Sequence, residues 1–141
     1  MRAARVLVLA SVVLLGACED DRVRETKARL VGTWFAESEV QGTRVQRELT
    51  LAPDGAAKEI TRTRTANGAS ASETREGEWF FDGVNVKRKY TFIDGKPLTN
   101  AYFIYETQTL QSVTDTELVG TSTVGAGTIR LVRVRPERTR P

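Results

Sequence analysis

The chain of 141 residues contains no histidine and one cysteine, Cys18. Histidine is the commonest general base and metal ligand, so its absence removes Ser–His and Cys–His nucleophile pairs and most zinc sites. A single cysteine cannot form an intramolecular disulfide, so core packing and strand pairing must hold the fold together. The sequence also lacks a Ser-x-x-Lys motif and a glycine-rich phosphate loop. We therefore expect no enzyme, no catalytic residues, no metal and no cofactor.

Long hydrophobic runs are scarce, and the one that stands out is Val6–Leu15. It follows two positive residues, Arg2 and Arg5, and precedes two small residues, which is the layout of an export signal. The run is shorter than the roughly 18 to 20 residues that a stable transmembrane helix needs. The sequence thus predicts a signal peptide over residues 1–17 rather than a permanent membrane span.

Basic and acidic residues are nearly equal in number once residues 1–17 are removed. Residues 1–17 hold two of the 21 basic residues and none of the 18 acidic ones, so the remaining chain has a net charge of +1. That balance gives no reason to expect nucleic-acid binding. The 124 residues that remain correspond to one domain with a core of its own.

The residues around the cysteine, Leu15-Gly16-Ala17-Cys18, resemble the lipobox of bacterial lipoproteins. The resemblance implies cleavage by signal peptidase II before Cys18 and attachment of acyl chains to that residue. Several acyl chains anchor a protein stably where one chain binds reversibly. On this resemblance we expect a lipid-anchored cell-envelope protein that faces the periplasm, with the outer membrane favoured. The alternative is an ordinary cleaved signal that leaves a free thiol.

After the cysteine, residues 18–21 are expected to form a short tether and Arg22–Val31 a short helix. The helix prediction depends on acidic residues at its start and on Glu25 standing four residues before Arg29. Four extended residues would hold the domain within roughly 15 Å of the anchor. The domain itself is predicted over residues 22–135, followed by a basic tail at 136–141.

From residue 33 onwards the pattern is extended, and seven turn signals such as Gln41-Gly42 separate eight predicted strands. The predicted strands are 33–40, 43–52, 56–65, 73–82, 84–93, 98–113, 117–124 and 128–135. Short connections favour an antiparallel meander. Eight such strands close most simply into an all-β up-and-down barrel, because closure removes exposed edges. A β-sandwich is the alternative architecture.

Apolar and polar residues alternate in several of these strands, and this alternation predicts which side chains face inwards. In the second strand, Val45, Leu49 and Leu51 share one face. In the fifth strand, the residues predicted to share the inner face are Val84, Val86, Tyr90 and Phe92.

The predicted barrel resembles the lipocalin and lipocalin-like families. Gly32-Thr33-Trp34 matches their G-x-W signature at the start of the first strand, and Thr114-Asp115 matches two positions of their T-D-Y turn, with Thr116 a departure. The resemblance implies that an arginine near the chain end, Arg130 or Arg133, lies over Trp34 in a cation–π contact. It also implies that Trp34 plugs the closed end of the barrel.

All ten aromatic residues lie between residues 34 and 105, whereas the last two predicted strands carry small or branched side chains. An eight-stranded barrel is just wide enough to fill itself or to hold one small ligand. Two outcomes are open: a cavity beside Gly120, Ser122 and Val124, or a lumen filled from the opposite wall. The aromatic residues that would fill it are Trp79, Phe81 and Phe92.

Aromatic runs in the fourth and sixth strands place rings on both strand faces. Trp79–Phe81 is one run, and Tyr102–Tyr105, which includes Ile104, is the other. One set must face outwards, where it would form an apolar surface unless the preceding helix covers it.

Two functions are therefore expected. In the first, a lipid-anchored barrel binds a small apolar or amphipathic ligand in its lumen. In the second, it is an interaction or inhibitor module that docks to an envelope protein through the outer apolar surface and holds no ligand.

Overall fold

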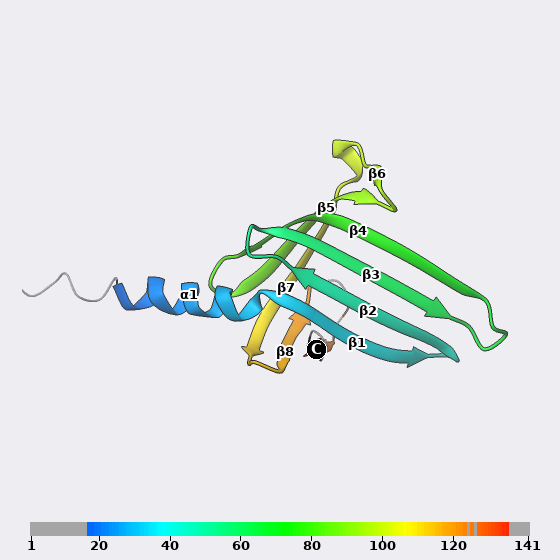
Figure 1. The fold of residues 1–141 in the computed structure, drawn as a ribbon, viewed down its shortest axis with the longest axis horizontal. Coiled ribbons are helices and arrows are strands. Elements are labelled where there is room, and N and C mark those ends of the chain that lie inside the picture. The colour runs from blue at the N-terminus through cyan, green and yellow to red at the C-terminus, as the bar shows by residue number, and fades with distance from the viewer. Residues whose placement is uncertain (1–16, 124, 126, 136–141) are drawn as a thin grey trace, which may run out of the picture.

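The computed structural model describes residues 17–123, 125 and 127–135, with side chains described from residue 21 onwards (Figure 1). The elements in chain order are α1 (Ala17–Leu30), β1 (Gly32–Val40), β2 (Thr43–Leu51), β3 (Ala56–Arg64), β4 (Ser70–Phe81), β5 (Asn85–Ile93), β6 (Lys96–Pro97), the 3₁₀ helix η1 (Asn100–Tyr102), β7 (Ile104–Val113), β8 (Glu117–Ser122) and β9 (Thr128–Arg133). Within this part of the chain, no helix has both the length and the apolar character needed to cross a membrane.

The strands form a closed, eight-stranded antiparallel barrel preceded by one helix. Neighbouring strands pair in the order β1, β2, β3, β4, β5, β7, β8, β9, and β9 pairs back with β1. The turn at Gln41-Gly42 has positive φ at both positions, 51° and 75°, which is the type I′ geometry that suits a two-residue hairpin. The predicted up-and-down barrel of lipocalin-like fold is confirmed, and the β-sandwich alternative is wrong.

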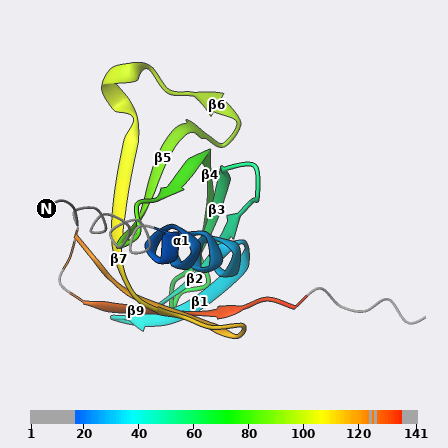
Figure 2. The same ribbon diagram turned by 90° about the vertical axis from the view of Figure 1, so that its left-hand side faces the viewer.

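Helix α1 begins earlier than predicted, at Ala17 instead of Arg22. The acidic residues 19–21 thereby occupy its first turns, and Lys27 and Arg29 its last turn, which suits the helix dipole at both ends. Residues 18–21 are therefore helical rather than an extended tether. At 1.5 Å per residue, the helix places Leu30 roughly 18 Å from the position of Cys18. Its first turns project away from the barrel (Figures 1 and 2).

The predicted strand 98–113 is shorter in the structure, where it begins only at Ile104. The two-residue strand β6 pairs with the end of β5 after the Asp94-Gly95 turn, η1 follows, and β7 begins only at Ile104. After β6 the Leu98 amide donates one more hydrogen bond to β5, of 2.7 Å, to the Thr91 carbonyl oxygen. The chain then turns into η1, where the Tyr102 amide donates to the Thr99 carbonyl oxygen at 2.8 Å. Tyr102 consequently lies in η1 rather than in a strand, within a segment that projects from the barrel in both views (Figures 1 and 2).

A β-bulge between β4 and β5 reverses the direction of one predicted inward side chain. Gly77 is opposite Tyr90 and Glu76 is opposite Phe92, so Thr91 has no partner in the register. Phe92 turns outwards and is 41% exposed. Gly77 permits this close approach, because a Cβ there would lie 1.9 Å from the carbonyl oxygen of Lys89.

Val84 is also exposed, since β5 begins one residue after it. The predictions that Phe92 and Val84 face the interior are therefore wrong. The inner face of β5 instead carries Val86, Arg88 and Tyr90, all of which are buried.

Apolar side chains gather at the end of the barrel where α1 enters. This closed end is a continuous core in which Trp34 is fully buried and Trp79 and Phe81 are nearly so. The remaining core residues are Leu30, Leu49, Leu51, Ala57, Val86, Tyr90, Leu118 and Leu131. Burial of this surface is the main stabilising contribution that the fold receives.

At the opposite end, which we call the open end because a hollow lies there, β1 to β4 continue well beyond β7 and β8 (Figure 1). Strands β1 and β9 pair at only two positions, Trp34 with Arg133 and Phe35 with Val132. From Ala36 onwards β1 pairs with β2 alone, so the barrel wall separates along the two strands. We call this separation the β1–β9 seam.

Candidate ligand-binding site

The closed end of the barrel is built around Trp34. The Trp34 indole Nε1 donates a hydrogen bond of 2.8 Å to the Leu30 carbonyl oxygen at the end of α1. The Arg133 guanidinium lies 4.1 Å from the centre of the Trp34 ring, a cation–π contact. Arg130, the other candidate for this position, instead forms an ion pair with Glu117.

The same arginine ties the helix to the barrel. Arg133 Nη1 donates to the Val31 carbonyl oxygen at 2.7 Å, and its Nε donates to the Asp115 carbonyl oxygen at 2.8 Å. Gly32 makes room for it, because a Cβ at that position would lie 2.3 Å from Arg133 Nη1. The Thr114 hydroxyl accepts a hydrogen bond of 3.0 Å from the Glu117 amide and shapes the adjoining turn. The residues on which the sequence resemblance rests therefore hold α1 against the closed end of the barrel.

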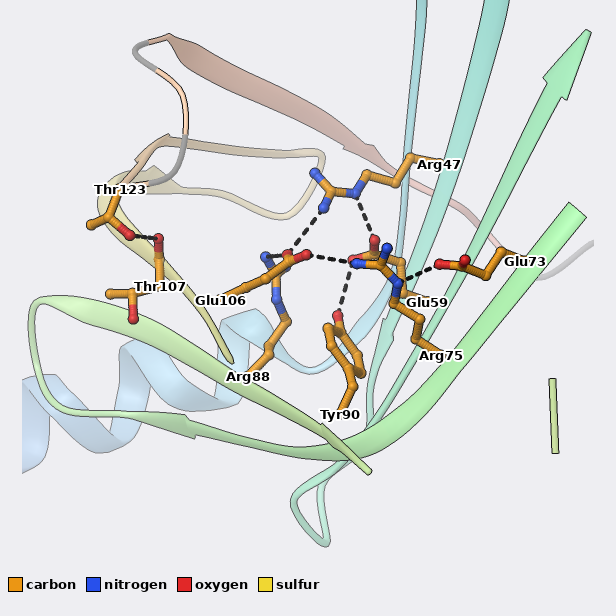
Figure 3. Close-up of polar contacts among 9 residues, drawn as sticks. All are labelled: Arg47, Glu59, Glu73, Arg75, Arg88, Tyr90, Glu106, Thr107 and Thr123. Atoms are coloured by element: carbon orange, nitrogen blue, oxygen red, sulfur yellow. Dashed lines mark hydrogen bonds and ion pairs between the residues drawn. The ribbon is translucent and has the colours of Figure 1, made fainter. Parts of the chain in front are cut away.

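Above the core, charged side chains point into the barrel towards one another (Figure 3). Side chains from β2, β3, β4, β5 and β7 converge on one another across the lumen. We call this set the charged layer, and its members are Arg47, Glu59, Glu73, Arg75, Arg88, Tyr90 and Glu106.

Glu59 is the most buried acid of the charged layer, with 1% of its surface exposed. Its carboxylate accepts one hydrogen bond from Arg47 Nε and one from the Tyr90 hydroxyl, each 2.9 Å long. Burial raises the pKa of the Tyr90 hydroxyl, so the phenol stays protonated and donates. Both carboxylate oxygens of Glu59 are thus occupied.

Glu106 is shared by three arginines. Its Oε2 accepts hydrogen bonds from Arg47 Nη2 at 3.1 Å and from Arg88 Nη2 at 2.8 Å. Its Oε1 accepts a hydrogen bond from Arg75 Nη1 at 3.0 Å. Charge-assisted hydrogen bonds of this kind are the strong ones, and together they fix the three guanidinium groups relative to one another.

The arginines of the charged layer remain positive. Burial by itself lowers the pKa of Arg47, but the neighbouring carboxylates of Glu59 and Glu106 outweigh it and raise the pKa above its ordinary value. In the same way, burial lowers the pKa of Arg75 and its acidic partners, Glu73 first, raise it overall. The guanidinium groups of Arg47 and Arg75 therefore remain positive beside the carboxylates that they contact.

A cavity of about 480 Å³ opens above the charged layer, along the β1–β9 seam. Arg47, Glu59 and Arg75 form its floor. Apolar groups from three strands line part of its wall, namely Ala36, Val45 and Ile129, and the remaining lining residues are Glu37, Ser38, Thr61, Thr128 and Arg130. The arrangement offers a molecule one apolar surface and one charged surface.

A second hollow of about 420 Å³ adjoins the first on the inner face of β3 and β4. The two share Thr61 and Arg75 in their linings. Glu73 also lines the second hollow, so Arg75 and its acidic partner both border this space.

The cavity borders β9, but the space expected beside Gly120 of β8 is filled. Gly120 is buried, and a Cβ there would lie 2.8 Å from Gln108 Nε2, so the side chain of Gln108 occupies that space. Neither of the two hollows at the open end is lined by Gly120 or Ser122. Val124 lies outside the described residues.

Exposed aromatic rings are found on the outer face of β4, β5 and β7 and on the neighbouring η1. The exposed fractions are 57% for Phe80, 72% for Tyr102 and 65% for Tyr105. We call these residues, with Phe92, the outer aromatic surface. Helix α1 packs at the closed end and leaves these rings exposed. Ile104 instead turns towards the core and is half-buried.

The sequence prediction missed the charged layer, although the alternation of inward and outward side chains along the strands indicates part of it. Arg47 stands on the same strand face as Val45 and Leu49, and Arg88 stands between Val86 and Tyr90 on an inner face. A charge at an otherwise apolar alternating position indicates a buried ion pair rather than a solvated strand face.

Comparison with known proteins adds no assignment: no family model matches the chain, and no curated protein matches it.

Proposed function

We propose that the protein is a lipid-anchored cell-envelope protein whose barrel binds a small amphipathic molecule at its open end. The observation that carries the proposal is the cavity of about 480 Å³, which combines a partly apolar wall, formed by Ala36, Val45 and Ile129, with a charged floor. Its size is within the range of small-molecule sites. A wholly apolar ligand fits less well than an amphipathic one, because it would remove water from the floor without replacing its hydrogen bonds.

The membrane anchor in this proposal is supported by the lipobox-like segment and by the single cysteine. Cleavage before Cys18 would leave the acylated residue at the start of α1. A helix of that length would act as a spacer between the membrane surface and the closed end of the barrel. The open end, with its cavity, would then face away from the membrane that holds the anchor.

The ligand part is tested by native mass spectrometry of the full chain purified from its own envelope, followed by organic extraction. We expect a reproducible bound mass that extraction releases. Ser38 lines the cavity near its mouth, so Ser38→Trp should obstruct the cavity and abolish the bound mass while leaving the β-sheet circular dichroism unchanged. A bound mass that persists in Ser38→Trp would place the ligand elsewhere.

The outer aromatic surface favours a second candidate function, docking to an envelope protein. Apolar side chains that gather on a surface commonly mark interaction sites, and Phe80, Phe92 and Tyr105 share the outer face of three neighbouring strands, which also carries Lys87 and Lys89. In this case the purified protein should carry no bound mass, and cross-linking through Phe80 and Tyr105 should capture one reproducible partner. A bound small molecule without any cross-linked partner would contradict this second candidate.

The anchor is tested by the substitution Cys18→Ser. We expect the variant to lose all incorporation of labelled fatty acid, because the serine oxygen is not the acceptor for the acyl-glycerol group. The variant should also change its distribution between membrane and soluble fractions. Labelling that is equal in the variant and the parent protein would disprove the anchor.

A further inference from the structure

We infer that Arg75, assisted by Arg47, forms an anion subsite that binds the headgroup of the amphipathic ligand. The ligand class is then a single carboxylate or phosphate group on an apolar stem. This inference rests on the proposed ligand-binding function and narrows it.

The first step of the argument is the hydrogen-bonding inventory of the charged layer. Both carboxylate oxygens of Glu59 and both of Glu106 already accept hydrogen bonds from within the layer. A guanidinium has five N–H donors, and Arg47 uses only its Nε and Nη2 and Arg75 only its Nε and Nη1. The described part of the chain supplies no acceptor for Arg47 Nη1 or Arg75 Nη2.

Buried groups deeper in the lumen show the same imbalance. Arg88 Nε and Gln108 Nε2 are buried and have no hydrogen-bond partner among the described residues. Both are nitrogen atoms that donate. These two buried donors add to the unused N–H groups of Arg47 and Arg75, and a group that carries acceptor oxygens would complement them.

The second step is accessibility. The side chains of Arg47 and Arg75 are 27% and 26% exposed and both line the cavity, whereas those of Glu59 and Arg88 are only 2% and 4% exposed. On the floor of the cavity, the guanidinium groups of Arg47 and Arg75 are therefore more accessible than the Glu59 carboxylate. Arg75 borders both hollows. A headgroup bound to it would leave the space along the β1–β9 seam free for the apolar stem of the ligand.

The third step identifies what the headgroup replaces. Glu73 stands two residues before Arg75 on β4, with its Oε1 2.5 Å from Arg75 Nε, and it is the most exposed acid of the charged layer, at 41%. Water screens this ion pair more than the other pairs of the charged layer, because its acid is the most exposed, so it is the contact that exchanges at the lowest cost. The headgroup of the ligand takes the place of the Glu73 carboxylate, which turns into solvent.

The test is isothermal titration of the full chain in lipid nanodiscs with octanoate, octyl phosphate and octanol, using empty nanodiscs as the blank. We expect both anionic probes to bind more tightly than octanol. Arg75→Gln should weaken octanoate binding about tenfold or more, as loss of a charge-assisted hydrogen bond predicts. Glu73→Gln should strengthen octanoate binding several-fold, because it removes the internal competitor. Octanol binding should not change in either variant.

Arg62→Gln is the matched control, since Arg62 borders a hollow on the outer face of the same strands and its loss changes the net charge equally. It should leave all three affinities unchanged. Equal binding of octanol and octanoate, unaffected by Arg75→Gln or Glu73→Gln, would overturn the anion subsite while preserving the ligand-binding function. Absence of binding by all three probes would overturn both proposals.

Discussion

Glu59→Ala should destabilise the barrel by about 3–5 kcal/mol, because it removes one partner of a buried ion pair and leaves the other charged. In the native structure Glu59 is 1% exposed and accepts hydrogen bonds from Arg47 and Tyr90. The substitution would leave the Arg47 guanidinium short of one carboxylate and the Tyr90 hydroxyl without an acceptor. Urea unfolding followed by circular dichroism measures the change in the free energy of unfolding.

The neighbouring pair Lys58–Glu76 supplies the control. Its charged atoms are 3.4 Å apart, but the side chains are 51% and 44% exposed. Glu76→Ala should therefore cost no more than about 1 kcal/mol. Replacing both Arg47 and Glu59 by leucine should cost less than the sum of the two single replacements, because neither charge is then left unpaired. A cost for Glu59→Ala as small as that for Glu76→Ala would contradict the assignment of Glu59 to a buried network.

Trp34→Ala should destabilise the protein by about 3–5 kcal/mol, the range observed when a large buried aromatic side chain is truncated. Trp34 is fully buried in the closed-end core, donates a hydrogen bond to Leu30, and supports the guanidinium of Arg133. Its removal would leave a cavity and also loosen the contact between α1 and the barrel. The measurement is again the free energy of unfolding in urea.

The substitution Trp34→Phe separates the contribution of the buried ring to stability from that of the indole hydrogen bond. Phenylalanine keeps a ring beneath Arg133 but loses the indole N–H that bonds to the Leu30 carbonyl oxygen. We expect this variant to lose clearly less stability than Trp34→Ala. Equal losses in the two variants would show that the hydrogen bond, rather than the buried volume, provides the contribution of Trp34.

The sequence predicts most strand boundaries because local turn chemistry determines them. The Gln41-Gly42 turn separates predicted strands 33–40 and 43–52, and the observed strands are Gly32–Val40 and Thr43–Leu51. The bulge at Thr91 is different, because it depends on how β4 approaches β5 at Gly77. No property of the β5 sequence alone shows that Phe92 turns outwards.

The charged layer illustrates the same limit for the candidate site. Alternation along β2 places Arg47 on the inner face, but the acids that neutralise it, Glu59 and Glu106, are 12 and 59 residues further along the chain. Their meeting depends on the pairing register of several strands and on barrel closure. Strand periodicity therefore predicts the faces of the barrel, whereas the chemistry of its lumen requires the three-dimensional arrangement.

The short ladder between β1 and β9 also has a consequence for folding and for fluctuations of the native state. It joins the first and last strands of the domain, so its formation requires closure of the longest loop in the barrel, and we expect it to form late. With pairing at only two positions, it is where we expect amide hydrogen exchange to report the earliest opening of the wall. A molecule bound across this junction would bridge the two chain ends of the domain and shift the population towards the closed barrel by mass action.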